Sequence, residues 1–347
     1  MNKCRITALL ALLLVLSVGQ AVDAGVRKSG LTGAAFLKIG VGARPVALAS
    51  AYTTVTGDVN QLFYNPAGTA LGANGNQVTL FHNEWIADLS HDAVGYVRDV
   101  EGIGTIGVSL VTLGLSDINS DRDAVPQFVL DTGTFIPNDT RTSGSYNYRD
   151  LALGLTWARH VTNRLDMGIT GKIISQSIDS ETARAYALDL GAIYRIDYQN
   201  TKIGARINNL GSDIEFYDIG APLPLVFSIG ASSDVYANAD QGMKVTVLAD
   251  ATKAQDSEQL LFGGVEVQVM EMLQLRSGYK LNYQGIEDEK VDEANGGTFD
   301  APRTEEGLSA GLGVGFSMAG YDATVDYAFT EFGILDSVHR FSLQVAF

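Results

Sequence analysis

The last ten residues of the chain, 338-VHRFSLQVAF-347, alternate between apolar and polar side chains. Successive side chains of a β-strand point to opposite faces, so a strand here has one mostly apolar face and one mostly polar face. The apolar face carries Phe341, Leu343, Val345 and Phe347. A strand of this length, apolar on one side and ending in an aromatic residue, is typical of a wall segment in a transmembrane β-barrel.

The same alternation recurs back to residue 76, in segments of about ten residues separated by turn-forming residues. Helical periodicity is weak over this part of the chain. No stretch after the first 24 residues has 18 consecutive apolar side chains, so no transmembrane helix is expected. Fourteen segments fit the pattern, at 76–84, 91–99, 102–114, 149–159, 165–178, 183–196, 201–212, 224–237, 242–254, 259–270, 272–283, 304–317, 321–330 and 338–347.

The lengths of the connections support this count. Alternate gaps are short, at 100–101, 160–164, 197–200, 238–241, 271 and 318–320. The long gaps, 115–148, 212–223 and 284–303, all fall in the other set. Outer-membrane barrels have short periplasmic turns and longer external loops, and an even strand number leaves both barrel ends in the periplasm.

A soluble β-sandwich would also alternate, with one face on a shared core and the other in water. Here the polar face is built mainly of Gly, Ser and Thr, and aromatic residues stand near the ends of the apolar face, as at Tyr186, Tyr194, Tyr279 and Tyr283. That pattern favours a lipid-facing band with aromatic girdles. The sequence therefore predicts an all-β fold, a 14-stranded antiparallel transmembrane barrel, in the outer membrane of a diderm bacterium.

The N-terminus has the features of a secretory signal peptide. Two positive charges, Lys3 and Arg5, precede an apolar run, and Val22-Asp23-Ala24 offers a small-residue cleavage site. We expect residues 1–24 to be removed, residues 25–75 to form a hatch and residues 76–347 to form the barrel. Removal of the leader changes the formal net charge from −16 to −17 and removes Cys4, the only cysteine. This acidity argues against nucleic-acid binding, and the missing thiols exclude disulfides.

The stretch 34–72 is apolar and rich in Gly and Ala, yet it lacks strict alternation. It is too short to form a core of its own, so we expect it to lie inside the barrel as a hatch or plug. Asn65 can cap a helix whose first position is Pro66. Whether the hatch is a fixed stopper or a gate stays open, with a hinge expected near Gly57 and Gly68. The residues expected to pack the hatch are Gly40, Gly42, Arg44 and Pro45.

Charged residues recur on the predicted inward faces, and both signs occur. One interpretation is structural, with salt bridges in the lumen that hold the hatch. The other is functional, with the charges forming a polar pathway through the barrel. The residues are Asp166, Lys172, Asp189, Arg195, Lys244, Asp250, Glu266, Arg276, Lys280, Asp322 and Asp326.

The sequence contains only weak matches to catalytic and metal-binding motifs. Gly307-Leu308-Ser309-Ala310-Gly311 matches a nucleophile-elbow pattern but lies inside an alternating strand with no following helix. The longest loop carries acids and an amide at alternate positions, as in a calcium loop, but its sixth position is Arg122 rather than Gly. We expect no enzyme, no cofactor and no firm metal site. The weak calcium candidates are Asp117, Asn119, Asp121 and Asp123.

The N-terminal stretch also resembles a known family. The segments 36-FLKIGVGARP-45 and 62-LFYNPAG-68, with Ala51, Tyr52 and Asp58 between them, are similar to the PorV/PorQ family of FadL-like outer-membrane barrels. That family implies 14 strands and an N-terminal hatch with an Asn-Pro-Ala turn. The hatch motif here is Phe63, Tyr64, Asn65, Pro66, Ala67 and Gly68. The terminal set Phe341, Leu343, Val345 and Phe347 resembles the signal read by the barrel-assembly machinery.

The resemblance implies two functions. PorV-like proteins bind the C-terminal domains of secreted cargo at the type IX translocon, and this is the role we expect first. FadL-like proteins let hydrophobic molecules cross the outer membrane passively, which is the alternative. A purely structural barrel is a third possibility. The partners expected are membrane lipid and lipopolysaccharide, the barrel-assembly machinery, and the type IX translocon with its cargo.

Overall fold

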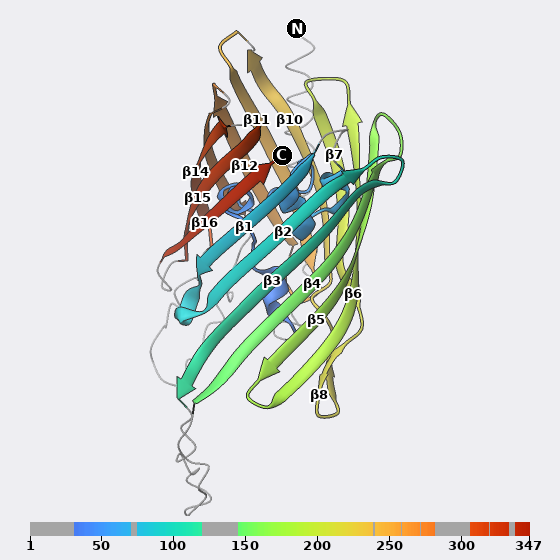
Figure 1. The fold of residues 1–347 in the computed structure, drawn as a ribbon, viewed down its shortest axis with the longest axis vertical. Coiled ribbons are helices and arrows are strands. Elements are labelled where there is room, and N and C mark those ends of the chain that lie inside the picture. Colours follow the sequence, from blue (N-terminus) through green and yellow to red (C-terminus); the bar gives the residue numbers. More distant parts are fainter. Residues whose placement is uncertain are drawn as a thin grey trace, which may run out of the picture.

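The computed structural model describes residues 31–70, 75–119, 145–238, 240–257, 259–270, 272–281, 306–318, 320–332 and 337–347. Fourteen strands of this part of the chain form one closed antiparallel barrel (Figure 1). The strands are β1 (Asn76–Glu84), β2 (Ser90–Val100), β3 (Gly104–Asn119), β4 (Ser145–His160), β5 (Leu165–Ile178), β6 (Glu181–Ile196), β7 (Thr201–Gly211), β10 (Val226–Asn238), β11 (Met243–Ala254), β12 (Gln259–Val269), β13 (Leu273–Leu281), β14 (Leu308–Met318), β15 (Tyr321–Glu331) and β16 (Ser337–Ala346).

The barrel closes where the first strand meets the last. β1 pairs with β16 with Leu80 opposite Leu343, and Asn76 and Phe347 exchange two backbone hydrogen bonds of 2.9 Å each. Every other barrel strand pairs with its neighbours in chain order. The predicted 14-stranded antiparallel barrel is therefore confirmed, and each predicted segment overlaps one strand.

The outer face of the wall is apolar. On β4, for example, Leu153, Leu155 and Trp157 are exposed, whereas Ala152, Thr156 and Ala158, which alternate with them, face inward and are buried. The same alternation runs around the barrel, so the exposed face is a belt of Leu, Ile, Val and aromatic side chains. A bilayer is the solvent that such a belt requires. In the described ranges, no helix is both long enough and apolar enough to span a membrane.

The two ends of the barrel differ. One end carries the short turns that follow β2, β4, β6, β10 and β14, and we call it the periplasmic end by the loop-length rule of outer-membrane barrels. At the other, external end the wall formed by β3 to β6 extends farther than its neighbours (Figure 1). A small hairpin, β8 (Ile214–Phe216) and β9 (Ile219–Ala221), lies in the connection between β7 and β10. The sequence was expected to form only a loop there.

Residues 31–70 lie inside the barrel (blue in Figure 1) and form four short helices rather than strands. These are the 3-10 helices η1 (Ala35–Lys38), η2 (Val59–Phe63) and η3 (Pro66–Thr69) and the α-helix α2 (Ala43–Ala47). A fifth helical turn, η4 (Ile86–Asp88), joins β1 to β2. The predicted boundary at residue 24 lies outside the described residues, so the division into leader, hatch and barrel stays a prediction.

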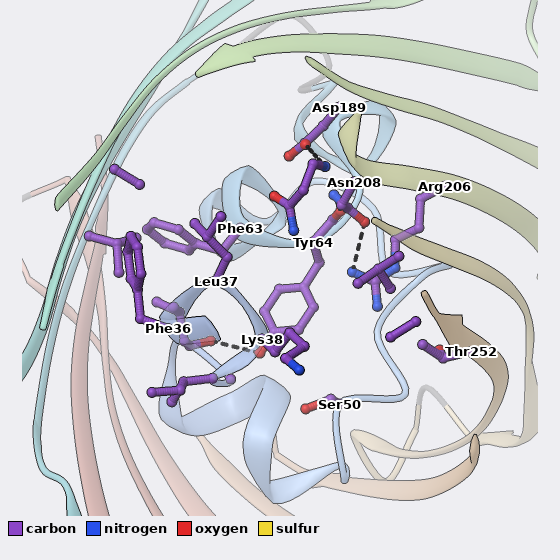
Figure 2. A pocket seen from close by; sticks show the side chains of 18 of the residues that line it. Phe36, Leu37, Lys38, Ser50, Phe63, Tyr64, Asp189, Arg206, Asn208 and Thr252 are labelled. Carbon is purple, nitrogen blue, oxygen red and sulfur yellow. Dashed lines mark hydrogen bonds between the residues drawn. The ribbon is translucent and has the colours of Figure 1, made fainter. Parts of the chain in front are cut away.

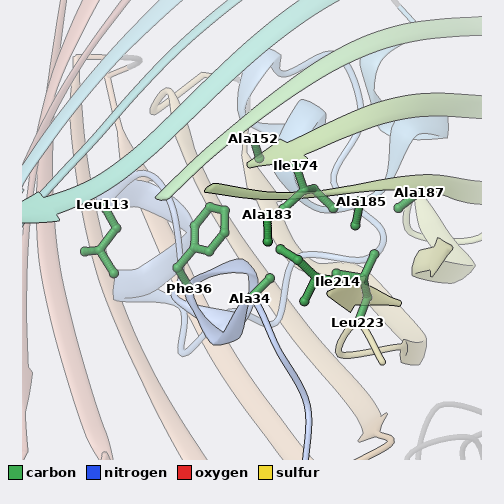
Figure 3. Close-up of a cluster of buried hydrophobic side chains, with 10 residues drawn as sticks. All are labelled: Ala34, Phe36, Leu113, Ala152, Ile174, Ala183, Ala185, Ala187, Ile214 and Leu223. Atoms are coloured by element: carbon green, nitrogen blue, oxygen red, sulfur yellow. The ribbon is translucent and has the colours of Figure 1, made fainter. Parts of the chain in front are cut away.

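Within the described residues, the largest cluster of buried apolar side chains joins this internal segment to the wall. Figure 3 shows Phe36 and Ala34 against Leu113, Ile174 and small alanines of β4 and β6, with Ile214 of β8 beside them. The alanines leave room that the aromatic ring of Phe36 fills. The external hairpin and the start of the internal segment thus share one apolar core.

Candidate functional site

The internal segment, called the plug from here on, runs from the external end of the barrel to the periplasmic end. At its external start, Asp256 in the turn after β11 accepts hydrogen bonds of 2.5 Å from Thr32 Oγ1 and from Lys38 Nζ. At its far end, the backbone oxygen of Gly57 accepts a bond from Gln77 of β1. Burial raises the pKa of Asp256, but the bonds from Lys38 and Thr32 outweigh burial and hold it below the usual 3.8.

Within the plug, the residues of the predicted motif are structural. Asn65 caps η3 by accepting a bond from the Ala67 nitrogen, and Pro66 occupies the first helical position, as the sequence predicts. The Asn65 side-chain amide also donates to the Thr53 oxygen at 2.7 Å. The backbone nitrogen of Gly57 donates to the Gly68 oxygen at 2.8 Å, so the two expected hinge glycines are tied to each other.

One buried side chain, Gln61, organises the turn around this motif. Its amide nitrogen donates to the oxygens of Tyr52 and Val55, both at 2.7 Å, and its amide oxygen accepts from the Asn65 nitrogen at 3.0 Å. Gln61 has no exposed surface. Irregular backbone can exist at membrane depth only when its polar groups find partners, and Gln61 supplies three of them.

The predicted packing residues Gly40, Gly42 and Pro45 lie at the start of α2. Gly42 has a φ of +87°, a conformation that L side chains rarely adopt, and precedes the helix. A Cβ atom on Gly40 would come within 2.8 Å of the Val46 side chain. Both glycines therefore serve local packing, and Pro45 is buried within the helix.

The inner wall approaches the plug closely at glycines. In the described part of the chain, nine strands each have one glycine whose added Cβ atom would come within 3.0 Å of a plug atom. The atoms approached belong to residues 47–49, 53, 62 and 65–67 of the plug. The inner surface of the wall is therefore complementary in shape to the plug in this one position. We call these nine residues the girdle glycines: Gly95, Gly107, Gly168, Gly191, Gly204, Gly230, Gly264, Gly278 and Gly311.

A buried network of charges attaches α2 to the wall. Arg44 makes a two-pronged contact with Glu266 of β12, at 2.9 and 2.8 Å, and donates to Asp58 of the plug at 2.6 Å. Arg276 of β13 donates to Glu266 at 2.7 Å and to Asp326 of β15 at 2.5 Å. Paired guanidinium–carboxylate forks of this kind are strong and directional, so they fix the position of Arg44.

Five other predicted lumen charges also lie in ion pairs. Arg195 contacts Asp166 near the periplasmic turns, Lys172 contacts Asp189 at 2.8 Å and Lys280 contacts Glu306 at 2.5 Å. Asp322 is exposed at the periplasmic start of β15. The structure therefore places these residues in several separate groups around the lumen, and whether they form a polar pathway stays a prediction.

The calcium candidates are described only in part. Asp117 lies at a bulge of β3 and bonds to Asn147 and Ser145, and Asn119 ends that strand. Asp121 and Asp123 lie outside the described residues. Within the ranges that the structure describes, no group of three or more His, Cys, Asp or Glu residues is arranged to hold a metal ion.

Between the plug and the external half of the wall lies a cavity of about 370 Å³. Figure 2 shows Phe36, Leu37 and Phe63 on one side of it, Arg206, Asn208 and Asp189 on the other, and Tyr64 between them. Leu260 and Phe262 of β12 add further apolar surface. The volume is in the range of small-molecule sites, and the mixed lining suits a molecule with an apolar body and one polar group.

The polar side of the cavity is already well ordered. The side-chain amide of Asn208 donates to the backbone oxygen of Tyr64 at 2.8 Å. Arg206 donates to Thr53 Oγ1 at 3.1 Å and to Asn208 Oδ1 at 3.3 Å. A bulge between β6 and β7 brings the Asn209 nitrogen to Asp189, at 2.8 Å. The hatch-motif residues Phe63 and Tyr64 therefore line the cavity, while Asn65 to Gly68 hold the plug fold beneath it.

Sequence patterns missed several residues of this site. Gln61, Asn208, Asn209 and Asp256 have no periodic signal, because their partners lie at unrelated positions along the chain. The inward position of Asp256 could not be read from alternation, since it lies in a turn. Repeated glycines at inward-facing strand positions indicate close packing, but they do not identify the plug residues that pack against them.

Comparison with known proteins agrees with this architecture. Residues 15–156 match the family model described as an uncharacterised protein family, UPF0164. No functionally curated protein gives a significant match. In fold, the chain is similar to the toluene transporters TbuX of Ralstonia pickettii (TM-score 0.52, 12% identity, 88% of this chain and 97% of that chain) and TodX of Pseudomonas putida (0.52, 11%, 87% and 96%).

A FadL homologue of Pseudomonas aeruginosa is similar to the same degree, with a TM-score of 0.51 and 11% identity over 89% of this chain and 98% of that chain. At such identities the likeness is one of fold. The FadL-like part of the predicted resemblance is thus confirmed as a fold, and the PorV/PorQ part stays a prediction. A closed barrel of this type with an apolar outer belt is an outer-membrane protein, as the sequence predicts.

Proposed function

We propose that the protein is a non-enzymatic outer-membrane channel that takes up small hydrophobic molecules and binds them in the cavity above the plug. The observation that carries the proposal is the apolar lining of that cavity, to which Phe36, Phe63 and Phe262 all contribute inside a closed barrel. The FadL-like fold supports the proposal, because solved proteins of that fold include toluene transporters.

The polar side of the cavity narrows the class of ligand. Arg206, Asn208 and the Lys172–Asp189 pair can hydrogen-bond one polar group, whereas the aromatic side can only bury apolar surface. A molecule with a single polar end therefore satisfies more of the lining than a pure hydrocarbon does. We expect a long-chain carboxylic acid to bind more tightly than toluene.

A cavity-filling variant tests the proposal. Ala152 is buried on the inner face of β4 and lines the cavity, whereas its neighbour Leu153 is exposed on the outer face. Titration calorimetry of the purified protein in detergent, with toluene and with palmitate, should show binding that Ala152→Phe weakens at least tenfold. Leu153→Phe is the matched control and should leave both affinities unchanged. No binding of either probe, or equal loss in both variants, would contradict the proposal.

Routing of type IX cargo, expected first from the N-terminal motifs, rests on that resemblance alone and stays a prediction. Affinity purification from membranes tests it, because a cargo-routing protein should recover a translocon and cargo C-terminal domains. The lipid, assembly-machinery and translocon partners likewise stay predictions.

A further inference from the structure

A row of three buried polar side chains crosses the external end of the wall, and none of the three lines the cavity. Arg340 of β16 stands opposite Asn83 of β1, and Asn83 stands opposite His91 of β2. All three point into the barrel and are at most 1% exposed. Directly opposed side chains on neighbouring strands have Cβ atoms about 5 Å apart, so the three form one continuous patch.

Most polar atoms of this row have no hydrogen-bond partner among the described residues. Within that part of the chain, Arg340 Nε, both side-chain atoms of Asn83 and both ring nitrogens of His91 are buried without a hydrogen bond. Buried polar groups nearly always find partners, because a buried donor or acceptor left without a hydrogen bond keeps its full desolvation penalty. Five such atoms on adjacent residues therefore mark a place where an outside group completes the structure.

The row carries the positive charge of Arg340, which forms no ion pair with any described residue. Arg340 donates to Thr330 Oγ1 at 2.7 Å, and its guanidinium lies 5.2 Å from the Trp85 ring and 5.7 Å from the Phe332 ring. Among the described residues, no carboxylate lies within ion-pair distance of it, in contrast to Arg44 and Arg276 in the plug network. A buried guanidinium without a counter-charge strongly favours an anion beside it.

The donor set also defines the chemistry of that anion. Arg340 Nε, the Asn83 amide nitrogen and one His91 nitrogen offer three N–H donors on one patch, with aromatic walls from Trp85, Phe332 and Phe81. Several N–H donors around one positive charge match an oxyanion such as a carboxylate or a phosphate. We propose that Arg340, Asn83 and His91 form a binding site for a small oxyanion group at the external end of the barrel.

The turn between β1 and β2 is the entrance to this site. Trp85 covers Arg340 and also lines a surface hollow at the external rim with Ile86 and Leu89. The turn is closed by a 2.7 Å bond from the Trp85 nitrogen to the Leu89 oxygen. Its central residues, Ala87 and Asp88, have φ values of 61° and 59°, a conformation that favours Gly or Asn. Displacement of this turn would lift Trp85 from the row and admit the anion.

The intrinsic fluorescence of Trp85 can report binding at this site, because the chain has only two tryptophans. In a Trp157→Phe background, the fluorescence of Trp85 should change saturably when sodium acetate or sodium phosphate is titrated at constant ionic strength set with sodium chloride. Asn83→Leu and His91→Phe should each weaken that response at least tenfold. His339→Gln is the control, since His339 is adjacent to Arg340 on β16 but points outward, and it should leave the response unchanged.

The design separates a binding site from simple core packing. If the row were only packing, Asn83→Leu and His91→Phe would raise thermal stability and the anions would have no effect in any variant. A response to dissolved acetate or phosphate assigns a free oxyanion. A response that appears only when phosphatidylglycerol replaces phosphatidylcholine in nanodiscs assigns a lipid headgroup. No response to either source, or a response that both variants retain, overturns the proposal.

Discussion

The backbone of Gly168 lies so close to that of Ala67 that a Cβ atom added to Gly168 would stand 2.6 Å from the Ala67 nitrogen. Gly168 belongs to the wall and Ala67 to the plug, and neither side has a flexible side chain at the contact that could move away. The contact is one of the nine girdle contacts of the described chain, so the plug is matched to the wall around most of its circumference. From this match we predict that the plug is a stopper, fixed in the resting state.

We predict that Gly168→Ala destabilises the seated plug by about 1–3 kcal/mol, because the added methyl group must displace backbone. Thermal unfolding in detergent, followed by circular dichroism, should show a lower transition temperature. Gly171→Ala on the same strand is the control, since nothing lies within 4 Å of a Cβ atom there. Equal stability of the two variants would show that the plug is not held in this position.

We predict that Arg44→Met opens the channel to ions. The substitution leaves Asp58 and Glu266 buried without their shared partner, and breaking a buried ion pair costs about 3–5 kcal/mol. Conductance in planar bilayers should rise from a closed baseline to frequent openings. Arg164→Met, which breaks an exposed pair with Asp197, should stay closed. A silent Arg44→Met channel would argue that packing alone holds the plug.

The barrel could be predicted from the sequence because its signal is local. The alternation of Phe341, Leu343 and Val345 with polar residues records which face meets lipid, and loop lengths record which end is which. Asn65 and Pro66 likewise encode a cap within their own four residues. Local sequence patterns were therefore sufficient to predict the barrel strands and the Asn65–Pro66 helix cap.

The seating of the plug could not be predicted in the same way. Arg44 and Glu266 are 222 residues apart, and the sequence around either residue gives no indication that the other is its partner. The row of Arg340, Asn83 and His91 depends on the register of β16, β1 and β2, which exists only once the barrel has closed. The hairpin β8–β9 was missed because three-residue strands are too short to show alternation.

We predict that Asp256→Asn loosens the external start of the plug at neutral pH. Asp256 holds Thr32 and Lys38, and its folded pKa is depressed below 3.8, so its contribution is present above that value and is lost as pH falls through the depressed pKa. Hydrogen exchange of the Phe36 and Leu37 amides should accelerate in the variant at pH 7, and in the wild type only below about pH 3.8. Unchanged exchange in the variant would show that Phe36 packing is sufficient.

We predict that removal of Phe347 impairs insertion of the barrel. Phe347 exchanges two backbone bonds with Asn76 at the closing seam and packs against Tyr321 with ring centroids 5.9 Å apart. Its deletion removes one seam bond pair and the terminal ring of the predicted assembly signal. Fractionated membranes should contain several-fold less folded barrel, judged by heat-modifiable mobility. Phe347→Tyr, which keeps the ring, should restore the level, and normal levels after deletion would refute the signal.

The direction of the barrel in the membrane can be fixed with two single cysteines, because the chain after residue 24 has none. Ser180 is exposed in the turn after β5, at the end we assign as external, and Asn163 is exposed in the turn before β5, at the periplasmic end. A membrane-impermeant maleimide should label Ser180→Cys on intact cells and Asn163→Cys only after the outer membrane is permeabilised. This orientation places the Thr32 to Lys38 attachment and the Trp85 turn on the outside, where ligand arrives. The reverse labelling would invert the barrel and put both entrances in the periplasm, which no uptake mechanism through the cavity could use.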